Sequence, residues 1–417
     1  MRVLIATDSF PPGCGGSGWS TYELARGLRA RGHELTIVQP RPGHRHGERE
    51  YDGFVVREFG VFAPAIPFVR NYLKNERLYA DLANVLRQVA ADTKAEVLHG
   101  QHVMTIPPVI DAAAGAGLPS VATVRDYWPV CYWSDLIHDP SADTLCPACS
   151  APAMRRCLRP RAGGSWPLAL PLVPYMRSNL ARKQRALARA DRVVAVSSTI
   201  AKDLEARSAG LDPRRLVTIP NPVDVAAIRA AADAHRPSPR APFVLYVGKL
   251  APNKGTRHLL AAVEHASLRW PLVIVGDGPD RPAIERWSRE SGSDVILTGW
   301  LPREQALGWL AAASVLVFPS KGPESLSRVL LEASALGVPI AAMDTGGTRD
   351  IILPGRTGLL STGGRGLGED VARLIADRAL ASRLGDAARA HIEALFAVDC
   401  VAARIEAIYR EVAAEHA

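Results

Sequence analysis

The sequence predicts an α/β protein built from two doubly wound, mostly parallel sheets. Short apolar runs alternate with stretches of helical periodicity along almost the whole chain, which is the pattern of parallel sheets covered by helices. A polar, proline-rich passage at 234–242 interrupts this alternation and indicates a linker. The length of 417 residues leaves room for two domains with sizeable cores.

The expected strands form one series on each side of the linker. They are short runs rich in Val, Ile and Leu, as is typical of strands that are buried on both faces. The first series comprises Val3–Ala6, Leu35–Val38, Phe54–Val56, Val97–Leu98, Val121–Val124, Val193–Val196 and Val217–Ile219. The second comprises Phe243–Val247, Leu272–Val275, Val295–Leu297, Val315–Phe318 and Pro339–Ala342.

These series predict a Rossmann-like domain over 1–236, a second over 242–396 and a last helix over 398–417 that can pack on either domain. Open α/β sheets bind ligands beyond the carboxyl ends of their strands. We therefore expect the two domains to face each other across a cleft that holds the site.

Composition excludes several classes of protein. Apolar residues at 47% and charged residues at 22% are ordinary for globular proteins, which excludes disordered and fibrous chains. Asp8 precedes any signal-peptide core, and an uninterrupted apolar stretch of about 18 residues is absent. Six cysteines in a chain of this length are not a disulfide scaffold. A cytoplasmic location is therefore expected.

The net charge of +8 belongs to one segment of the chain. Residues 155–192 hold ten Lys or Arg and one acid, so the remainder is close to neutral and a general nucleic-acid-binding surface is excluded. Within an insert over 126–192, the apolar stretch 163–176 precedes most of these bases. Segment 163–192 therefore predicts peripheral contact with the inner face of a membrane. The alternative is a solvated helix that packs on its own domain.

Four cysteines gather just before the basic segment, at Cys131, Cys146, Cys149 and Cys157. Cys146 and Cys149 have the C-x2-C spacing, and four thiolates suit tetrahedral Zn²⁺. A structural zinc ion is the prediction. An iron–sulfur cluster, a disulfide and four unlinked thiols are the alternatives.

Two lysines follow the first strand of the second domain. Gly248 and Lys249 end this strand, and Lys254 opens the next helix, five positions later. Both cations can reach one pyrophosphate at such a turn and neutralise it without a metal. Two solvated surface lysines are the alternative. The next strand also ends in a glycine turn that includes Gly278.

Glu324 and Glu332 are eight positions apart, around the start of a helix. If Glu324 lies just before this helix, backbone N–H groups of Ser325, Leu326 and Ser327 can face a phosphate. Glu332 lies about two turns further on and can face a ribose from the same side.

The first domain offers weaker signals. The glycine-rich loop at 11–18, which includes Gly16, is either a phosphate contact or a plain tight turn. His99 and His102 follow a predicted strand and are candidates for contact with an acceptor, as is Asp126.

Taken together, these motifs resemble the family 4 glycosyltransferases of the two-domain GT-B fold, over nearly the whole chain. The motifs occur in the order found in that family. They are the Gly15-Gly16 loop, Leu24–Leu28, Arg31–Thr36, Ile219–Asp224, Gly248-Lys249, Lys254-Gly255, Gly276–Pro279, the two glutamates and Gly355–Gly358.

The resemblance implies retaining, metal-independent transfer of a sugar from a nucleotide diphosphate-sugar to a hydroxyl of a glycan or lipid-linked acceptor. Lys249 and Lys254 are implied to hold the diphosphate, Glu324 a sugar hydroxyl and Glu332 the ribose. The remaining donor-side positions are Gly16, Asn221, Gly248, Gly278, Ser325, Leu326 and Ser327. The resemblance also implies that the last helix, 398–417, returns to the first domain.

One position departs from the family pattern. Arg125 precedes Asp126-Tyr127-Trp128, where relatives often have a histidine. An arginine can pair with a phosphate or an acidic acceptor group but cannot act as an acid or base near neutral pH. A structural pairing with Asp126 is the alternative. Two other readings of the whole chain remain: another GT-B enzyme such as a nucleotide-sugar epimerase, and a non-catalytic sugar-nucleotide-binding protein.

Overall fold

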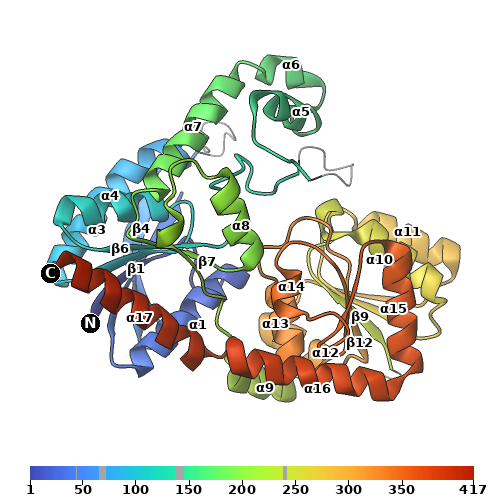
Figure 1. The fold of residues 1–417 in the computed structure, drawn as a ribbon. Helices are drawn as coiled ribbons and strands as arrows, with labels where there is room; N and C mark the ends of the chain where they lie inside the picture. The colour runs from blue at the N-terminus through green and yellow to red at the C-terminus, as the bar shows by residue number, and fades with distance from the viewer. Residues whose placement is uncertain (44, 65–71, 138–144, 238–241) are drawn as a thin grey trace. The chain divides into compact units, whose positions relative to one another are not determined.

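The computed structural model describes residues 1–417 apart from 44, 65–71, 138–144 and 238–241. Part of the predicted linker and part of the predicted insert therefore lie outside the described residues. The chain divides into two compact units, each with its own sheet (Figure 1). Unit 1 comprises Met1–Asp135, Ala148–Pro222 and Val398–Ala417, and unit 2 comprises Leu136–Pro147 and Val223–Ala397.

Unit 1 is built on a sheet of eight strands in the order β3-β4-β2-β1-β5-β6-β7-β8. All neighbouring strands are parallel except β3 and β4. The strands are β1 (Arg2–Ala6), β2 (Glu34–Pro42), β3 (Gly47–Tyr51), β4 (Phe54–Val61), β5 (Val97–Gly100), β6 (Ser120–Val124), β7 (Arg192–Ala195) and β8 (Leu216–Thr218).

Helices cover both faces of this sheet, and β1 shows why. Val3 and Ile5 belong to an apolar cluster with side chains of α1 and α17, whereas Leu4 and Ala6 belong to a second cluster with α3 and α4. Successive side chains of a strand point to opposite faces, so a continuous apolar run supplies both clusters. The helices are α1 (Gly16–Ala30), α3 (Leu78–Asp92), α4 (Ile106–Ala116), α5 (Ala151–Ala162), α6 (Trp166–Ala169), α7 (Leu172–Leu187), α8 (Ser198–Arg207) and α17 (Val398–His416).

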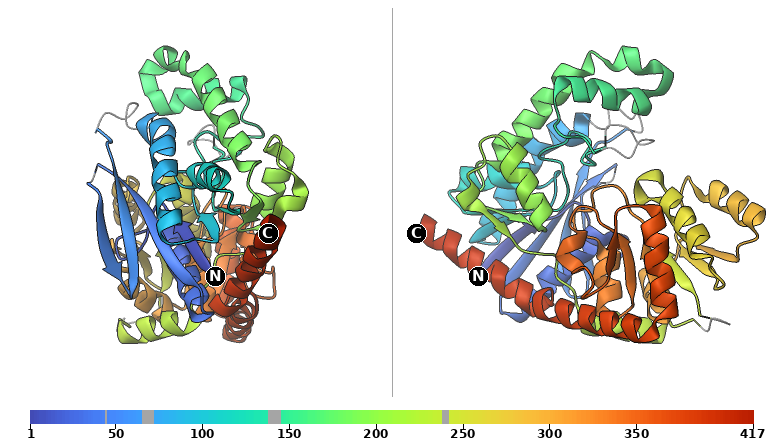
Figure 2. Two further views of the ribbon diagram at one scale, coloured as in Figure 1. Left: turned by 90° about the vertical axis from the view of Figure 1, so that its left-hand side faces the viewer. Right: turned by 45° about the vertical axis from the view of Figure 1, so that its right-hand side comes forward.

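Helices α5, α6 and α7 project away from the sheet of unit 1 in all three views (Figures 1 and 2). They share a small apolar core of their own, formed by Met154, Cys157, Leu158, Ala169, Val173, Met176 and Leu180. Short turns complete the unit, a π-helical turn at Leu73–Arg77 and 3-10 turns at Gly163–Ser165 and Pro213–Arg215.

Unit 2 has a sheet of six strands, all parallel, in the order β11-β10-β9-β12-β13-β14. The strands are β9 (Val244–Val247), β10 (Leu272–Val275), β11 (Val295–Gly299), β12 (Val315–Phe318), β13 (Ile340–Met343) and β14 (Leu359–Ser361). Its helices are α9 (Val225–Ala234), α10 (Thr256–Ala266), α11 (Arg281–Ser291), α12 (Arg303–Ala312), α13 (Arg328–Ala335), α14 (Thr348–Ile351), α15 (Gly364–Ala376) and α16 (Arg378–Leu395), with a 3-10 turn at Pro252–Lys254.

The predicted fold class is confirmed, and two strands were missed. Strand β3 is largely exposed and polar, so it lacks the apolar signal of a buried strand. Strand β14 has only three residues. The longer segment of unit 2 begins at Val223, where α9 packs on α12, and α17 belongs to unit 1.

Candidate functional site

The loops at the carboxyl ends of β9 and β10 lie side by side in unit 2. The Gly248 N–H donates to the Val275 carbonyl at 3.0 Å, and the Leu250 N–H donates to the Asp277 carbonyl at the same distance. Gly278 lies directly against Leu250. Gly248, Lys249 and Gly278 therefore belong to one surface at the carboxyl edge of this sheet.

Gly255 brings the following turn against the loop after β12. Its backbone φ is +74°, and a Cβ there would lie 1.7 Å from the Pro319 carbonyl oxygen. Only glycine combines this conformation with so close an approach. Lys254 is thereby held beside the loop that carries Ser320 and Glu324.

Lys254 and Glu324 form an ion pair. The Lys254 Nζ lies 2.6 Å from Glu324 Oε1, and Ser320 Oγ donates to the same oxygen. Glu324 is mostly buried and Lys254 is about one-third exposed. The backbone of Glu324 is fixed as well, because the Gly347 N–H donates to its carbonyl at 2.6 Å. Lys249 is exposed.

Glu332 lies on α13 and is buried between two arginines. Its Oε1 accepts from Arg303 at 2.9 Å and from Arg328 at 3.0 Å. Burial by itself raises the pKa of this carboxyl, but the two guanidinium groups outweigh it and hold the pKa below its ordinary value. Glu332 is therefore ionised at neutral pH and can accept hydrogen bonds. Arg328 precedes it by four positions, a spacing visible in the sequence, whereas nothing in the sequence pointed to Arg303.

Helix α13 begins at Arg328 rather than directly after Glu324, where the sequence analysis placed its start. Ser325 and Leu326 precede the helix and Ser327 is its N-cap. The N–H groups of its first turn therefore belong to residues 328–330 rather than to 325–327.

Gly16 is the first residue of helix α1 in unit 1. Gly16 therefore lies at the N-terminus of this helix. Backbone N–H groups at such a position favour an anion.

Arg125 is buried in unit 1, where two side-chain amides hold its guanidinium. One Nη donates to Asn221 Oδ1 and the other to Gln101 Oε1. Asn221, a donor-side candidate, also lies in unit 1 and is fixed by this contact.

His99 does not face a ligand, which corrects its assignment as an acceptor contact. It is fully buried, with Nδ1 2.6 Å from the Tyr409 hydroxyl of α17 and Nε2 2.7 Å from Thr123 Oγ1. Burial and the positive charge of Arg125 lower the pKa of His99 to about 3, so it is neutral. A strand-end histidine in the sequence cannot reveal a partner 310 positions away.

His102 and Asp126 remain neighbouring candidates. His102 Nδ1 lies 3.9 Å from Asp126 Oδ2, and burial followed by the charge of Arg125 lowers the pKa of His102 to about 3. Burial raises the pKa of Asp126 to about 6, although a hydrogen bond from the Trp128 N–H acts to lower it.

The described residues do not form the predicted zinc site. Among them, no group of three or more His, Cys, Asp or Glu is placed to hold a metal ion. Cys146 belongs to unit 2 and the other three to unit 1. The Cys157 Sγ donates to the Met154 carbonyl, and a hydrogen bond with Cys131, followed by burial, raises the pKa of Cys149.

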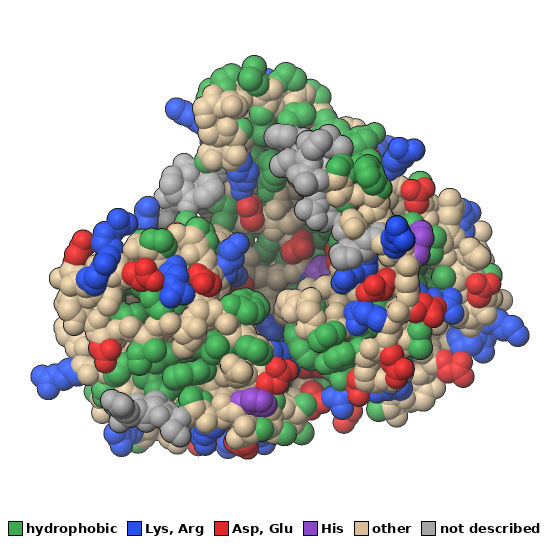
Figure 3. All heavy atoms as spheres, turned by 180° about the vertical axis from the view of Figure 1, so that it is seen from behind, with side chains coloured by type: hydrophobic (Ala, Val, Ile, Leu, Met, Phe, Trp, Pro, Cys, Tyr) green, Lys and Arg blue, Asp and Glu red, His purple; other side chains and the backbone are tan. Residues whose placement is uncertain are grey.

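Many bases of segment 155–192 are neutralised by acids far away in the sequence. Arg161 pairs with Asp135, Arg182 with Glu76, Arg189 with Asp111, and Arg192 with Glu411 and Glu415. Ala169, Val173 and Met176 are buried within the insert, but Leu168 is 84% exposed. Figure 3 shows hydrophobic side chains at the tip of this projection. Over the described residues, no helix is long and apolar enough to cross a membrane.

Two parallel-sheet units with glycine-bounded loops and a lysine–glutamate pair at a carboxyl edge define a GT-B type of enzyme. Comparison with protein families supports this class. Residues 14–227 match the model "Glycosyltransferase Family 4", and residues 241–377 match "Glycosyl transferases group 1". The chain therefore belongs to glycosyltransferase family 4. It is a retaining glycosyltransferase that uses a nucleotide-sugar donor, and this family is generally metal-independent.

Curated relatives match over most of the chain. A GDP-mannose-dependent alpha-mannosyltransferase of Mycobacterium tuberculosis (strain CDC 1551 / Oshkosh) is 29% identical over 401 residues, covering 92% of this chain and 91% of the relative. A protein of the same description from Mycolicibacterium smegmatis is 28% identical, covering 86% of this chain and 84% of the relative.

Solved structures show the same fold. A sucrose-phosphate synthase from Thermosynechococcus elongatus superposes with a TM-score of 0.70 at 20% identity, covering 99% of both chains. HepE of Anabaena in complex with UDP superposes with a TM-score of 0.68 at 17% identity, covering 99% of this chain and 100% of that one.

Proposed function

We propose that unit 2 binds the nucleotide diphosphate-sugar and that unit 1 binds the acceptor. The observation that carries this assignment is the Lys254–Glu324 pair at the carboxyl edge of the unit 2 sheet. A lysine ammonium has three N–H donors, and Glu324 takes one of them. Two donors remain for the oxygens of a diphosphate.

Lys249 and Lys254 act on the charge of the leaving group. As the bond between the sugar C1 and the diphosphate oxygen breaks, negative charge accumulates on that oxygen. The two ammonium groups, of which Lys254 is held in place by Glu324, stabilise it without a metal ion. The acceptor hydroxyl forms the new bond to C1 on the same face, and its proton passes to the departing diphosphate oxygen, so no protein base is needed.

The two glutamates hold other parts of the donor in this proposal. Ionised Glu332, fixed by Arg303 and Arg328, accepts hydrogen bonds from the ribose hydroxyls. Glu324 accepts one from a hydroxyl of the transferred sugar. A bound donor therefore draws on carboxylates that the fold has already oriented, so little ordering is needed on binding.

We propose that the donor is GDP-mannose and that mannose is the sugar transferred. The two relatives described above, which match over most of this chain, carry a description that names it. A thermal-shift series with GDP-mannose, UDP-glucose and ADP-glucose tests this choice, because the donor that binds most tightly raises Tm most at a fixed concentration. A larger shift with another donor would replace it.

Release of nucleotide diphosphate tests the residue roles. Lys254→Ala should abolish turnover and leave Tm within a few degrees of wild type. The matched control is Arg269→Ala, an exposed cation just before β10, at the opposite edge of the same sheet. Normal turnover in Lys254→Ala, or an equal loss in the control, would refute the assignment. Donor consumption without transfer to any acceptor would indicate an epimerase or a hydrolase.

We also propose peripheral membrane contact at the tip of the α5–α7 projection, from a cytoplasmic location. Leu168 is exposed there, and Arg155, Arg156 and Arg159 of α5 are exposed as well. Flotation with anionic vesicles should fall in Leu168→Gln and at high salt. Leu395→Gln, which removes an exposed leucine from α16, is the control. Flotation that responds to neither change would remove this proposal.

A further inference from the structure

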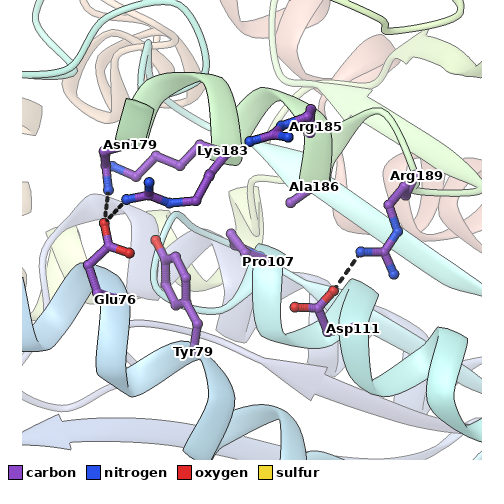
Figure 4. A pocket seen from close by; sticks show the side chains of 10 residues that line it. Glu76, Tyr79, Pro107, Asp111, Asn179, Lys183, Arg185, Ala186 and Arg189 are labelled. Atoms are coloured by element: carbon purple, nitrogen blue, oxygen red, sulfur yellow. Dashed lines mark hydrogen bonds and ion pairs between the residues drawn. The ribbon is translucent and has the colours of Figure 1, made fainter. Parts of the chain in front are cut away.

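A pocket of about 320 Å³ lies in unit 1 between α7 and the first turns of α3 and α4 (Figure 4). This volume falls at the lower end of the range for small-molecule sites. Because both α3 and α4 begin near the pocket, it is on the side of the sheet where the strands have their carboxyl ends. The lining residues are Glu76, Tyr79, Pro107, Asp111, Asn179, Arg182, Lys183, Arg185, Ala186 and Arg189.

The charges of the lining are unbalanced. Both carboxylates are already paired, Glu76 with Arg182 and Asp111 with Arg189 at 2.8 Å. Lys183 and Arg185 are the two lining cations for which the described residues provide no ion pair. Arg185 is exposed, and its Nε reaches only the Ala181 carbonyl.

Lys183 is an unusual lysine because its side chain is almost entirely buried. Only 6% of the residue is exposed, and its Nζ lies 5.9 Å from the ring centre of Tyr132. Burial lowers the pKa of Lys183 to about 8, although Asp126 and Glu76 act to raise it. Arg182 also lowers this pKa, and Cys131 raises it slightly. A cation held at this cost is well suited to a ligand that brings negative charge.

Asn179 adds an unused acceptor to the same lining. It is 2% exposed, and its Nδ2 donates to Glu76 Oε1 at 2.8 Å. Its Oδ1 is buried and accepts no hydrogen bond from the described residues. A buried oxygen without a donor is costly, and a ligand hydroxyl would satisfy it.

We infer that this pocket binds a phosphorylated sugar or polyol, with Lys183 and Arg185 on the phosphate and the Asn179 Oδ1 accepting from a hydroxyl. The inference rests on the proposed function in one respect, because it assigns this ligand as the acceptor. Asp126, the acceptor-side candidate, lies near enough to Lys183 to affect its charge. The pocket therefore adjoins the region where the acceptor is expected.

Isothermal titration of the full-length protein with glucose 6-phosphate, inorganic phosphate and glucose at pH 7 tests the inference. We expect glucose 6-phosphate to bind most tightly, and Lys183→Gln and Arg185→Gln each to weaken it about tenfold or more, as removal of a charged hydrogen bond does. Arg177→Gln, an exposed arginine on the same helix outside the pocket, should bind as wild type does. Because Arg185 is exposed, its variant reports on binding even if Lys183→Gln unfolds.

Several outcomes would overturn the inference. One is that neither glucose 6-phosphate nor inorganic phosphate binds at millimolar concentration. Another is that wild type and both pocket variants bind glucose 6-phosphate with equal affinity. A third is that glucose binds as tightly as glucose 6-phosphate. Loss of binding in Lys254→Ala alone would place the phosphate in unit 2. Phosphate binding that follows Lys183, in a protein that releases no nucleotide from any donor, would uphold the pocket and refute the proposed function. Flotation with vesicles that contain or lack phosphatidic acid tests whether the bound phosphate belongs to a lipid or to a soluble ligand. Only a lipid phosphate would make flotation with phosphatidic acid depend on Lys183.

Discussion

Gly255 allows Lys254 to reach the Ser320–Glu324 loop, and replacing it with alanine should be costly for two separable reasons. The first is backbone conformation. A φ of +74° costs a residue with a Cβ about 1–2 kcal/mol. The second is contact. The new Cβ would lie 1.7 Å from the Pro319 carbonyl oxygen, whereas Cβ atoms essentially never come within 3.0 Å of another heavy atom.

Gly292 isolates the first cost. It also belongs to unit 2, its φ is +67°, and a Cβ there would meet nothing within 4 Å. Gly292→Ala should therefore cost only the conformational share, about 1–2 kcal/mol, and lower Tm by roughly 2–8 °C in a unit of this size. In Gly255→Ala the backbone must move by more than an ångström, which places it among the severe substitutions at about 4 kcal/mol or more, or roughly 8–16 °C.

Thermal unfolding followed by circular dichroism measures both shifts, and donor binding to the folded protein measures the displacement of Lys254. We expect Gly255→Ala to lose donor affinity and Gly292→Ala to keep it. Equal Tm shifts in the two variants would refute the close approach of the loops. Unchanged donor affinity in a destabilised Gly255→Ala would refute the link between this approach and the lysine.

Three further predictions concern the stability of unit 1, the pH dependence of its pocket and the effect of metal removal on turnover. Arg125→Ala should lower the free energy of unfolding by about 2–6 kcal/mol, because buried acceptors on Asn221 and Gln101 each lose a donor. Chemical denaturation checks this, and an unchanged midpoint would contradict it. Affinity for glucose 6-phosphate should fall roughly tenfold from pH 7 to pH 9, since Lys183, with its pKa of about 8, is charged below that value and neutral above it. Isothermal titration at both pH values measures the change in affinity. In Lys183→Gln the affinity should no longer depend on pH, and a dependence that persists would contradict the role of Lys183. Turnover should survive EDTA, because lysines rather than a metal neutralise the diphosphate; loss of turnover restored by Mg²⁺ would count against that mechanism.

The sequence was sufficient where a local pattern has one physical solution. Continuous apolar runs such as Val315–Phe318 predicted buried parallel strands. Lys249 and Lys254 predicted two cations around a strand-to-helix turn, and Glu324 with Glu332 predicted acids around a helix start. Each of these signals lies within a few residues, so chain geometry alone relates the parts.

Tertiary structure decided every feature that depends on residues distant in the sequence. In the sequence His99 resembles a ligand contact, but in the fold its Nδ1 lies against the hydroxyl of Tyr409 in α17. Glu332 is ionised although it is buried, because folding brings Arg303 to it from 29 positions away.

The basic segment is the clearest case. The sequence gives its ten bases equal weight, but the fold pairs several of them with acids such as Glu76, Asp111 and Glu411. Lys183 is buried and has no ion-pair partner among the described residues, and Arg185 remains exposed beside it. Charge is a property of the sequence, whereas its pairing and its burial depend on which surfaces the fold brings together, and these two determine where an anionic ligand can bind.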